Sequence, residues 1–148
     1  MAEGISLEYI GTEHLTALST LEGKCFSCPW SEESFSECLE NDRYLFIGAF
    51  DKGNLVGYGG IITLFNEGDV ANIAVDESYR GRGIGRAILS RLCDEARGRG
   101  VELLYLEVRE SNTAARSLYD SFGFTVDGVR KNYYSRPTEN AVLMTKKL

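Results

Sequence analysis

A short stretch rich in arginine and glycine is the first feature of the sequence with the composition of a binding site. Residues 80–86 read RGRGIGR and lead into a pattern with helical spacing. Backbone N–H groups in the first turn of a helix have no internal partner, and glycines let an anion approach them closely. Nearby arginines would add charge-assisted hydrogen bonds. The stretch predicts a phosphate-binding loop, with a glycine-rich turn and solvated arginines as the alternative.

Two common phosphate-binding motifs do not fit this stretch. No Gly-Lys-Ser/Thr follows it, as a P-loop requires, and its spacing lacks the further glycine of a dinucleotide fingerprint. The ligand therefore has to be identified from other residues.

Glu107 is a second candidate, because it is a carboxylate within an otherwise apolar run. Residues 101–108 read VELLYLEV, which is typical of a central strand covered on both faces. Burying a lone carboxylate there is costly unless the group is paired or serves a site. An ion pair with Arg109 on the same strand face is the structural interpretation. A general base that takes a proton from an attacking amine is the functional one.

The segment after this strand holds two more candidates. Asn112 precedes a helical pattern that carries Ala115, Leu118 and Tyr119 on one face. From the residues alone, Asn112 reads as a helix cap and Tyr119 as a core aromatic. A phenol can also donate a proton, so Tyr119 has a catalytic alternative.

The cysteines indicate neither a metal site nor a covalent intermediate. The chain has four, Cys25, Cys28, Cys38 and Cys93, with a single C-x-x-C pair and one histidine, His14. A zinc site normally needs a second close pair or more histidines, so we expect no metal and reduced, structural thiols. No histidine is spaced to activate Cys93 as an acyl-carrying nucleophile.

Composition narrows the class of protein. A 148-residue chain with 43% hydrophobic residues suits one domain spanning residues 1–148. No apolar run approaches the length of a membrane span. We therefore expect a cytoplasmic protein without membrane or nucleic-acid partners. Residues 1–79 hold 3 Lys/Arg against 14 Asp/Glu. The acidic run 31–42 is either a docking surface for basic residues or an ordinary solvated helix face. No feature specifies an oligomeric state.

Periodicity predicts the order β-α-α-β-β-β-α-β-α-β-β. We expect Thr12 to cap the first helix, and Ser31 to cap the second between the staple residues Trp30 and Phe35. A turn over residues 66–69 separates two strands, and a tyrosine-rich connection over residues 130–140 joins the last two. The pattern predicts an α/β or α+β fold: a mixed, mostly antiparallel sheet of six to seven strands with helices on both faces.

Several motifs resemble a known family. The strand ANIAVD, the R-x-x-G-x-G spacing of residues 80–85 and the following helix resemble the acetyl-CoA signature of the GNAT superfamily of N-acetyltransferases. LEVRESNTAARSLYDSFGF (residues 106–124) resembles a segment of its RimI-type members, which acetylate the N-terminal amine of a small-subunit ribosomal protein. CFSCPWS and RKNYY are similar to other motifs of that subfamily, so the likeness covers about residues 25–134.

This resemblance implies a role for each candidate. Acetyl-CoA would be the cosubstrate, held by Ile73, Ala74 and Val75 on its pantetheine arm, by Arg80, Gly81, Arg82, Gly83, Ile84, Gly85 and Arg86 on its pyrophosphate, and by Asn112. An amide of the strand would polarise the thioester carbonyl for direct attack by the amine. Glu107 would be the general base, and Tyr119 would protonate the departing thiolate. Phe26, Trp30, Tyr133 and Tyr134 would surround the entering protein N-terminus, with the N-terminal alanine of a small-subunit ribosomal protein as the expected acceptor.

Two other functions fit the same motifs. One is a GNAT enzyme that acetylates a small amine or a lysine side chain, and dependence on peptide length separates it from the first. The other is a non-catalytic acyl-CoA-binding module, in which Glu107 and Tyr119 would be incidental. Normal turnover by a Glu107→Gln protein would remove the catalytic role of that residue.

Overall fold

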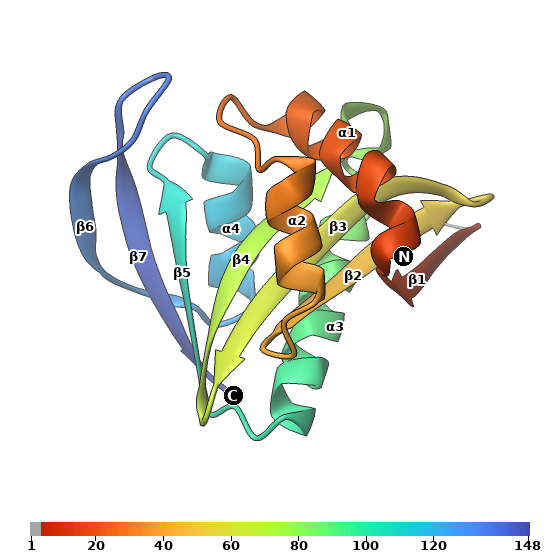
Figure 1. The fold of residues 1–148 in the computed structure, drawn as a ribbon. Helices are drawn as coiled ribbons and strands as arrows, with labels where there is room; N and C mark the ends of the chain where they lie inside the picture. The colour runs from red at the N-terminus through yellow and green to blue at the C-terminus, as the bar shows by residue number, and fades with distance from the viewer. Residues whose placement is uncertain (1–3) are drawn as a thin grey trace.

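Seven strands form one sheet in the computed structural model, which describes residues 4–148 (Figure 1). Their order across the sheet is β1-β2-β3-β4-β5-β7-β6, and only β4 and β5 are parallel neighbours. The strands are β1 (Ile5–Tyr9), β2 (Tyr44–Asp51), β3 (Asn54–Leu64), β4 (Glu67–Val75), β5 (Leu103–Arg109), β6 (Thr125–Tyr134) and β7 (Glu139–Lys147). The predicted mixed, mostly antiparallel sheet is confirmed.

Helices lie on both faces of this sheet, as predicted (Figure 1). One face carries α1 (Leu15–Cys25) and α2 (Glu32–Leu39), and the other carries α3 (Ile84–Gly98) and α4 (Thr113–Ser121). Short 3₁₀ turns precede α1 and α3. The predicted element order is therefore confirmed along the described chain. No helix among residues 4–148 is long and apolar enough to cross a membrane.

The start of α2 forms as its sequence predicts. The Ser31 hydroxyl accepts a hydrogen bond from the Ser34 amide at 3.1 Å, and the rings of Trp30 and Phe35 pack 5.3 Å apart across this cap. Phe35 is fully buried against Phe46 and Tyr58. This hydrophobic staple fixes the direction in which the α1–α2 loop enters the helix.

The sheet opens between β4 and β5. These two strands pair only where residues 67–69 meet residues 103–105, and beyond that point they diverge (Figure 1). The rest of β4 keeps its antiparallel pairing with β3, and its other edge has no strand partner within residues 4–148. A gap of this kind leaves backbone donors and acceptors free for a ligand.

A β-bulge at Ala71 changes the direction of the side chains in the diverging part of β4. Gly60 pairs with Asn72 and Ile61 pairs with Val70, so Ala71 is an extra residue. Val70 packs in the core beneath α3, whereas Ala74 packs in the core beneath α1 and α2. The bulge therefore points Asn72 and Ala74 toward α1.

The expected burial of β5 on both faces was wrong. Leu104, Leu106 and Val108 are buried toward α3 and α4, but Glu107 on the opposite face is exposed. The helices α1 and α2 pack over β2, β3 and β4 and do not extend over β5. The apolar run therefore did not indicate a second covering layer.

Three predicted boundaries also differ from the structure. The first helical segment begins after Gly11 rather than with a Thr12 cap, and α1 starts at Leu15. The turn predicted over residues 66–69 is shorter, because Glu67 pairs with Leu64 and extends β4. Most of the connection predicted over residues 130–140 is strand, since polar residues suit the exposed edge strand β6.

Candidate active site

The loop before α3 presents a row of unpaired amides. Within residues 4–148, no backbone N–H from Gly81 to Arg86 donates to a protein acceptor. Gly81 and Gly83 have φ values of 79° and 80°, a left-handed conformation that favours glycine, and a Cβ at either position would point into open space. Conformation rather than crowding therefore requires these glycines, and the amides are available to an anion.

The three arginines of the loop leave their charges unneutralised. Arg80 donates to the Val75 carbonyl at 3.0 Å, Arg82 to the Ser78 carbonyl at 3.2 Å and Arg86 to the Ser121 hydroxyl at 2.8 Å. None of the three forms an ion pair with a carboxylate of the described chain. The loop therefore keeps a positive field beside its free amides.

Two cavities meet where β4 and β5 diverge. The loop cavity, of about 560 Å³, is lined by the glycine-rich loop, the end of β4 and the start of α4. The tyrosine cavity, of about 610 Å³, is lined by β4 residues 71–73, by the end of β5 and by Tyr119, Tyr133 and Tyr134. Both cavities are lined by Cys25, Phe26, Ile73, Asn112 and Ala115. The two cavities are therefore neighbours that share part of their walls.

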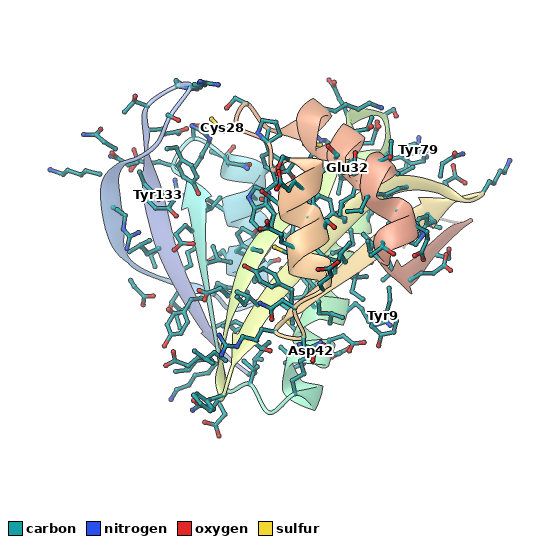
Figure 2. The ribbon with its side chains drawn as sticks, in the orientation of Figure 1. Tyr9, Cys28, Glu32, Asp42, Tyr79 and Tyr133 are labelled. Carbon is teal, nitrogen blue, oxygen red and sulfur yellow. The ribbon has the colours of Figure 1, made fainter. Side chains whose placement is uncertain are left out.

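The predicted site residues divide between these cavities. Ala74, Val75, Arg80, Gly81, Gly83, Ile84, Gly85 and Arg86 line the loop cavity. Trp30, Glu107, Tyr119, Tyr133 and Tyr134 line the tyrosine cavity, while Phe26, Ile73 and Asn112 line both. Arg82 lines neither, because its guanidinium lies over the Tyr79 ring. Cys28 and Tyr133 lie at the same end of the molecule (Figure 2).

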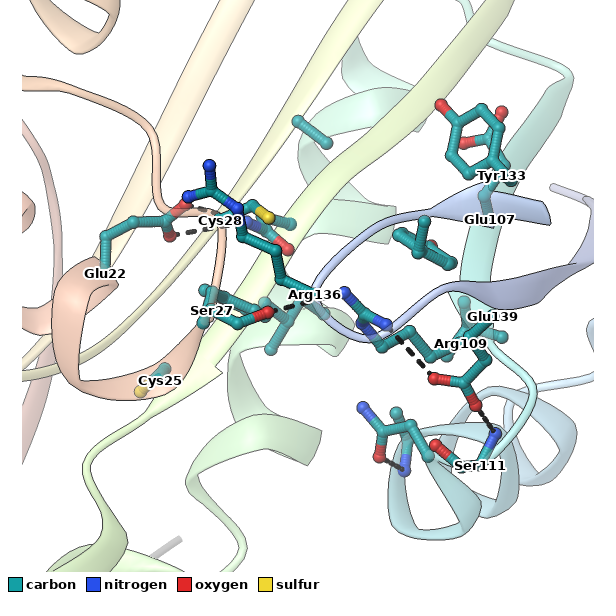
Figure 3. A pocket seen from close by; sticks show the side chains of 18 of the residues that line it. Glu22, Cys25, Ser27, Cys28, Glu107, Arg109, Ser111, Tyr133, Arg136 and Glu139 are labelled. Carbon is teal, nitrogen blue, oxygen red and sulfur yellow. Dashed lines mark hydrogen bonds and ion pairs between the residues drawn. The ribbon is translucent and has the colours of Figure 1, made fainter.

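Glu107 does not form the ion pair that its position suggested. Arg109 instead contacts Glu139 at 3.2 Å and donates to the carbonyls of Ser135 and Pro137 at 2.8 and 3.0 Å (Figure 3). The structural interpretation of Glu107, an ion pair with Arg109, was therefore wrong, because the guanidinium turns toward the β6–β7 turn. Glu107 is left exposed in the tyrosine cavity without an ion-pair partner among residues 4–148.

Burial holds the Tyr119 and Tyr134 hydroxyls of the tyrosine cavity in their protonated form. Burial and, to a smaller extent, the nearby charge of Glu107 raise the pKa of Tyr134 to about 12. Burial also raises the pKa of Tyr119, whose ring packs edge-on against Phe124 at 5.7 Å. Both roles that the sequence suggested for Tyr119 therefore fit the structure. Its ring packs in the core, and its phenol can donate a proton to the cavity.

Asn112 acts as the helix cap that the sequence indicated. Its side-chain oxygen accepts a hydrogen bond from the Ala115 amide at 3.1 Å, at the start of α4. The same residue lies where the two cavities join. A contact with a ligand there would come from the remaining amide nitrogen.

Sequence analysis missed Glu22, a buried carboxylate in the wall of the tyrosine cavity. Glu22, which lies in the wall of the cavity in Figure 3, is 1% exposed. Its carboxylate accepts hydrogen bonds from the Trp30 backbone amide, the Tyr58 hydroxyl and the Asn72 side-chain amide. The available signal was its position four residues after Leu18, on the apolar face of α1.

The thiols and the acidic segment complete the surroundings. All four cysteines are free; burial raises the pKa of Cys25, and a hydrogen bond with Ser135 lowers the pKa of Cys28. No cluster of three metal-ligating side chains occurs within residues 4–148.

The acidic side chains of α2 are exposed and unpaired in the described chain, as either interpretation of residues 31–42 requires.

Comparisons with known proteins agree on one family. The model of the acetyltransferase (GNAT) family matches residues 15–124. The [ribosomal protein bS18]-alanine N-acetyltransferase of Escherichia coli K12 is 38% identical over 143 residues, which cover 94% of this chain and 95% of that protein. The crystal structure of the E. coli ribosomal-protein-S18-alanine N-acetyltransferase superposes with a TM-score of 0.89 at 36% identity, covering 97% of this chain and 93% of that one.

A more distant structure shares the fold. The PaiA N-acetyltransferase of Thermoplasma acidophilum, solved in complex with coenzyme A, superposes with a TM-score of 0.83 at 20% identity over the full length of both chains. At this identity the likeness concerns the arrangement of helices and strands.

Proposed function

This chain belongs to the acetyltransferase (GNAT) family, and we propose that it acetylates the N-terminal alanine of a small-subunit ribosomal protein of the bS18 type. The observation that carries the proposal is the pair of adjoining cavities beside β4, one lined by the anion-binding loop and the other by the exposed carboxylate of Glu107. The similarity to bS18-alanine N-acetyltransferases over 94% of the chain supports the choice of acceptor. A ribosomal acceptor would place the enzyme in the cytoplasm.

The loop cavity has the chemistry that acetyl-CoA requires. The free amides from Gly81 to Arg86 and the unneutralised guanidiniums would hold its pyrophosphate. The edge of β4 at residues 73–75, which has no strand partner within residues 4–148, would hold its pantetheine arm. Asn112 would contact it at the junction of the cavities. When bound, acetyl-CoA supplies an acetyl group activated as a thioester.

Glu107 is the proposed general base. An N-terminal amine has a pKa of about 8, so much of it is protonated at neutral pH and must lose a proton before it can attack. Glu107 is exposed in the tyrosine cavity and free of ion pairs within the described chain, so its oxygens can accept that proton directly or through water.

Tyr119 is the proposed general acid. Its raised pKa keeps the phenol protonated at neutral pH, and it lines the same cavity as Glu107. A thiolate of ordinary pKa, about 8.5, takes a proton from a phenol efficiently only when the phenol is held close. Packing against Phe124 supplies that fixed position. Phe26, Trp30, Tyr133 and Tyr134 form the apolar walls along which the acceptor would enter.

Thiol release from acetyl-CoA tests this proposal directly. Three acceptors are compared: a peptide copying the N-terminus of the organism's own bS18 protein, the same peptide with a blocked N-terminus, and a polyamine. We expect turnover of the free peptide alone. Preference for the polyamine would reassign the acceptor to a small amine, and tight acetyl-CoA binding without turnover on any acceptor would indicate a binding module.

A further inference from the structure

The Glu22 carboxylate determines how the side chain of Asn72 is oriented. The Trp30 amide donates to one Glu22 oxygen at 3.0 Å, and the Asn72 side-chain nitrogen lies 3.3 Å from each oxygen. Both of these groups can only donate, so they require acceptor oxygens on Glu22. An Asn72 amide turned the other way would place its oxygen against the carboxylate, which is unfavourable. The Asn72 nitrogen therefore faces Glu22 and the Asn72 oxygen faces away.

The Asn72 oxygen is free and accessible. It accepts no hydrogen bond from any residue of 4–148, and no buried side-chain oxygen or nitrogen of the described chain lacks a partner. It is therefore not fully buried, and Asn72, which is half-buried, lines the tyrosine cavity. The bulge at Ala71 turns Asn72 out of the α3 core and toward α1, which brings it to Glu22.

Few other acceptor groups in this cavity are free. Both oxygens of Glu22 are occupied, those of Glu139 are bound by Arg109 and the Ser111 amide, and the Asn112 oxygen caps α4. Among the side-chain carboxylate and amide oxygens that line the cavity, this leaves those of Glu107 and Asn72. A protonated amine needs acceptors for each of its N–H groups.

We propose that the Asn72 side-chain oxygen binds the N-terminal amine of the acceptor, and that Glu22 is a positioning residue that acts through Asn72. The inference rests on the proposed function, because it assumes an acceptor with a free N-terminal amine in the tyrosine cavity. Asn72 holds one N–H group of the amine while Glu107 accepts the proton that is lost. No proton is transferred to Asn72 or Glu22.

Three variants and one control variant test the inference by steady-state kinetics with the bS18 peptide. Asn72→Leu removes the free oxygen at similar volume. Glu22→Gln adds a donor that lets the Asn72 amide turn round. Both should raise the KM for the peptide about 10-fold or more, as expected for the loss of a hydrogen bond to a charged group, with the KM for acetyl-CoA unchanged. The double variant should be no worse than Asn72→Leu alone, because Glu22 acts through Asn72.

Tyr58→Phe is the matched control. It removes a different donor from the same buried carboxylate and leaves the contact between Glu22 and Asn72 in place. We expect a lower melting temperature and an unchanged peptide KM. If Tyr58→Phe raised the peptide KM as much as Glu22→Gln, the network would be merely structural and the inference would be overturned.

Calorimetric binding of the peptide in the presence of coenzyme A separates this inference from the proposed function. Blocking the peptide N-terminus should weaken binding to the wild-type protein and have little further effect on Asn72→Leu. An equal loss in both proteins would overturn the role of Asn72 even if the enzyme acetylates the peptide. Absence of turnover together with the expected binding pattern would reject the proposed function and retain the amine site.

Discussion

Arg109 and Glu139 form an ion pair at 3.2 Å that joins β5 to the start of β7. The pair occupies the guanidinium that could otherwise have neutralised Glu107, two residues earlier on the same strand face. Of these two carboxylates in the tyrosine cavity, Glu139 therefore has a structural role and Glu107 is left without an ion-pair partner in the described chain.

Glu107→Gln should lower kcat about 100-fold or more, as expected for the loss of a general base, and leave the KM for acetyl-CoA unchanged. The substitution keeps the shape of an exposed side chain, so the melting temperature should not change. Assays of thiol release from acetyl-CoA at a series of fixed times measure the change in kcat. Glu110→Gln, also exposed and close to the end of β5, is the control and should have full activity. Full activity of Glu107→Gln would remove the assigned base.

Tyr119→Phe should lower kcat with little loss of stability, because the edge-on contact with Phe124 does not involve the hydroxyl. A decrease of about 100-fold is typical of removing a general acid. Because burial raises the pKa of Tyr119, its deprotonation should not reduce the wild-type rate below about pH 10. A rate that falls on the alkaline side only in the wild type, with a midpoint near pH 8, would contradict this assignment.

The contribution of Glu139 to stability should disappear in acid. Hydrogen bonds from Ser111 and the charge of Arg109 hold the pKa of Glu139 below its usual range in the folded protein. A carboxyl group with a lowered folded-state pKa stabilises the fold above its unfolded pKa of about 4.3, and this stabilisation is lost as the pH falls through the folded-state value. The melting temperatures of the wild type and Glu139→Gln should therefore differ at pH 7 and converge near pH 3. A difference in melting temperature that stays constant with pH would mean that the stabilisation by Glu139 does not depend on its charge.

Gly83→Ala should destabilise the protein by about 1 kcal/mol, because φ at this position is 80° and an L-residue is strained there. The added methyl group meets no atom, so the cost is conformational. The KM for acetyl-CoA should rise as the free amides shift. Gly98→Ala is the control, because its Cβ also meets open space but its φ is not positive, and it should not destabilise the protein. Chemical denaturation measures both. Equal stability changes in the two variants would argue against strain at Gly83.

Local sequence patterns predicted the parts of the site that depend on neighbours in the chain. The glycine-rich loop, the Ser31 cap and the staple between Trp30 and Phe35 each depend on residues within one turn of one another, and all form. The predicted burial of Glu107 was wrong, because burial there depends on how far α1 and α2 extend across the sheet. Nothing in the sequence of residues 101–108 contains that information.

The Glu22 network shows the other reason for failure. Its partners lie 8, 36 and 50 residues away along the chain, in the α1–α2 loop, on β3 and on β4. A carboxylate on the apolar face of α1 indicates that some partner exists, since a lone buried charge is costly, but it does not indicate which. Only the packing of α1 on β3 and β4 identifies Tyr58 and Asn72.

The short ladder between β4 and β5 has a mechanical consequence. Three residue pairs make up the strand pairing between the four-stranded part of the sheet and its three-stranded part in the described chain. We expect a rotation of the two parts about these pairs to change the width of the gap that both cavities border. A molecule that spans the gap would restrain the rotation, and its binding should be measurable as slower hydrogen exchange in the far parts of both strands.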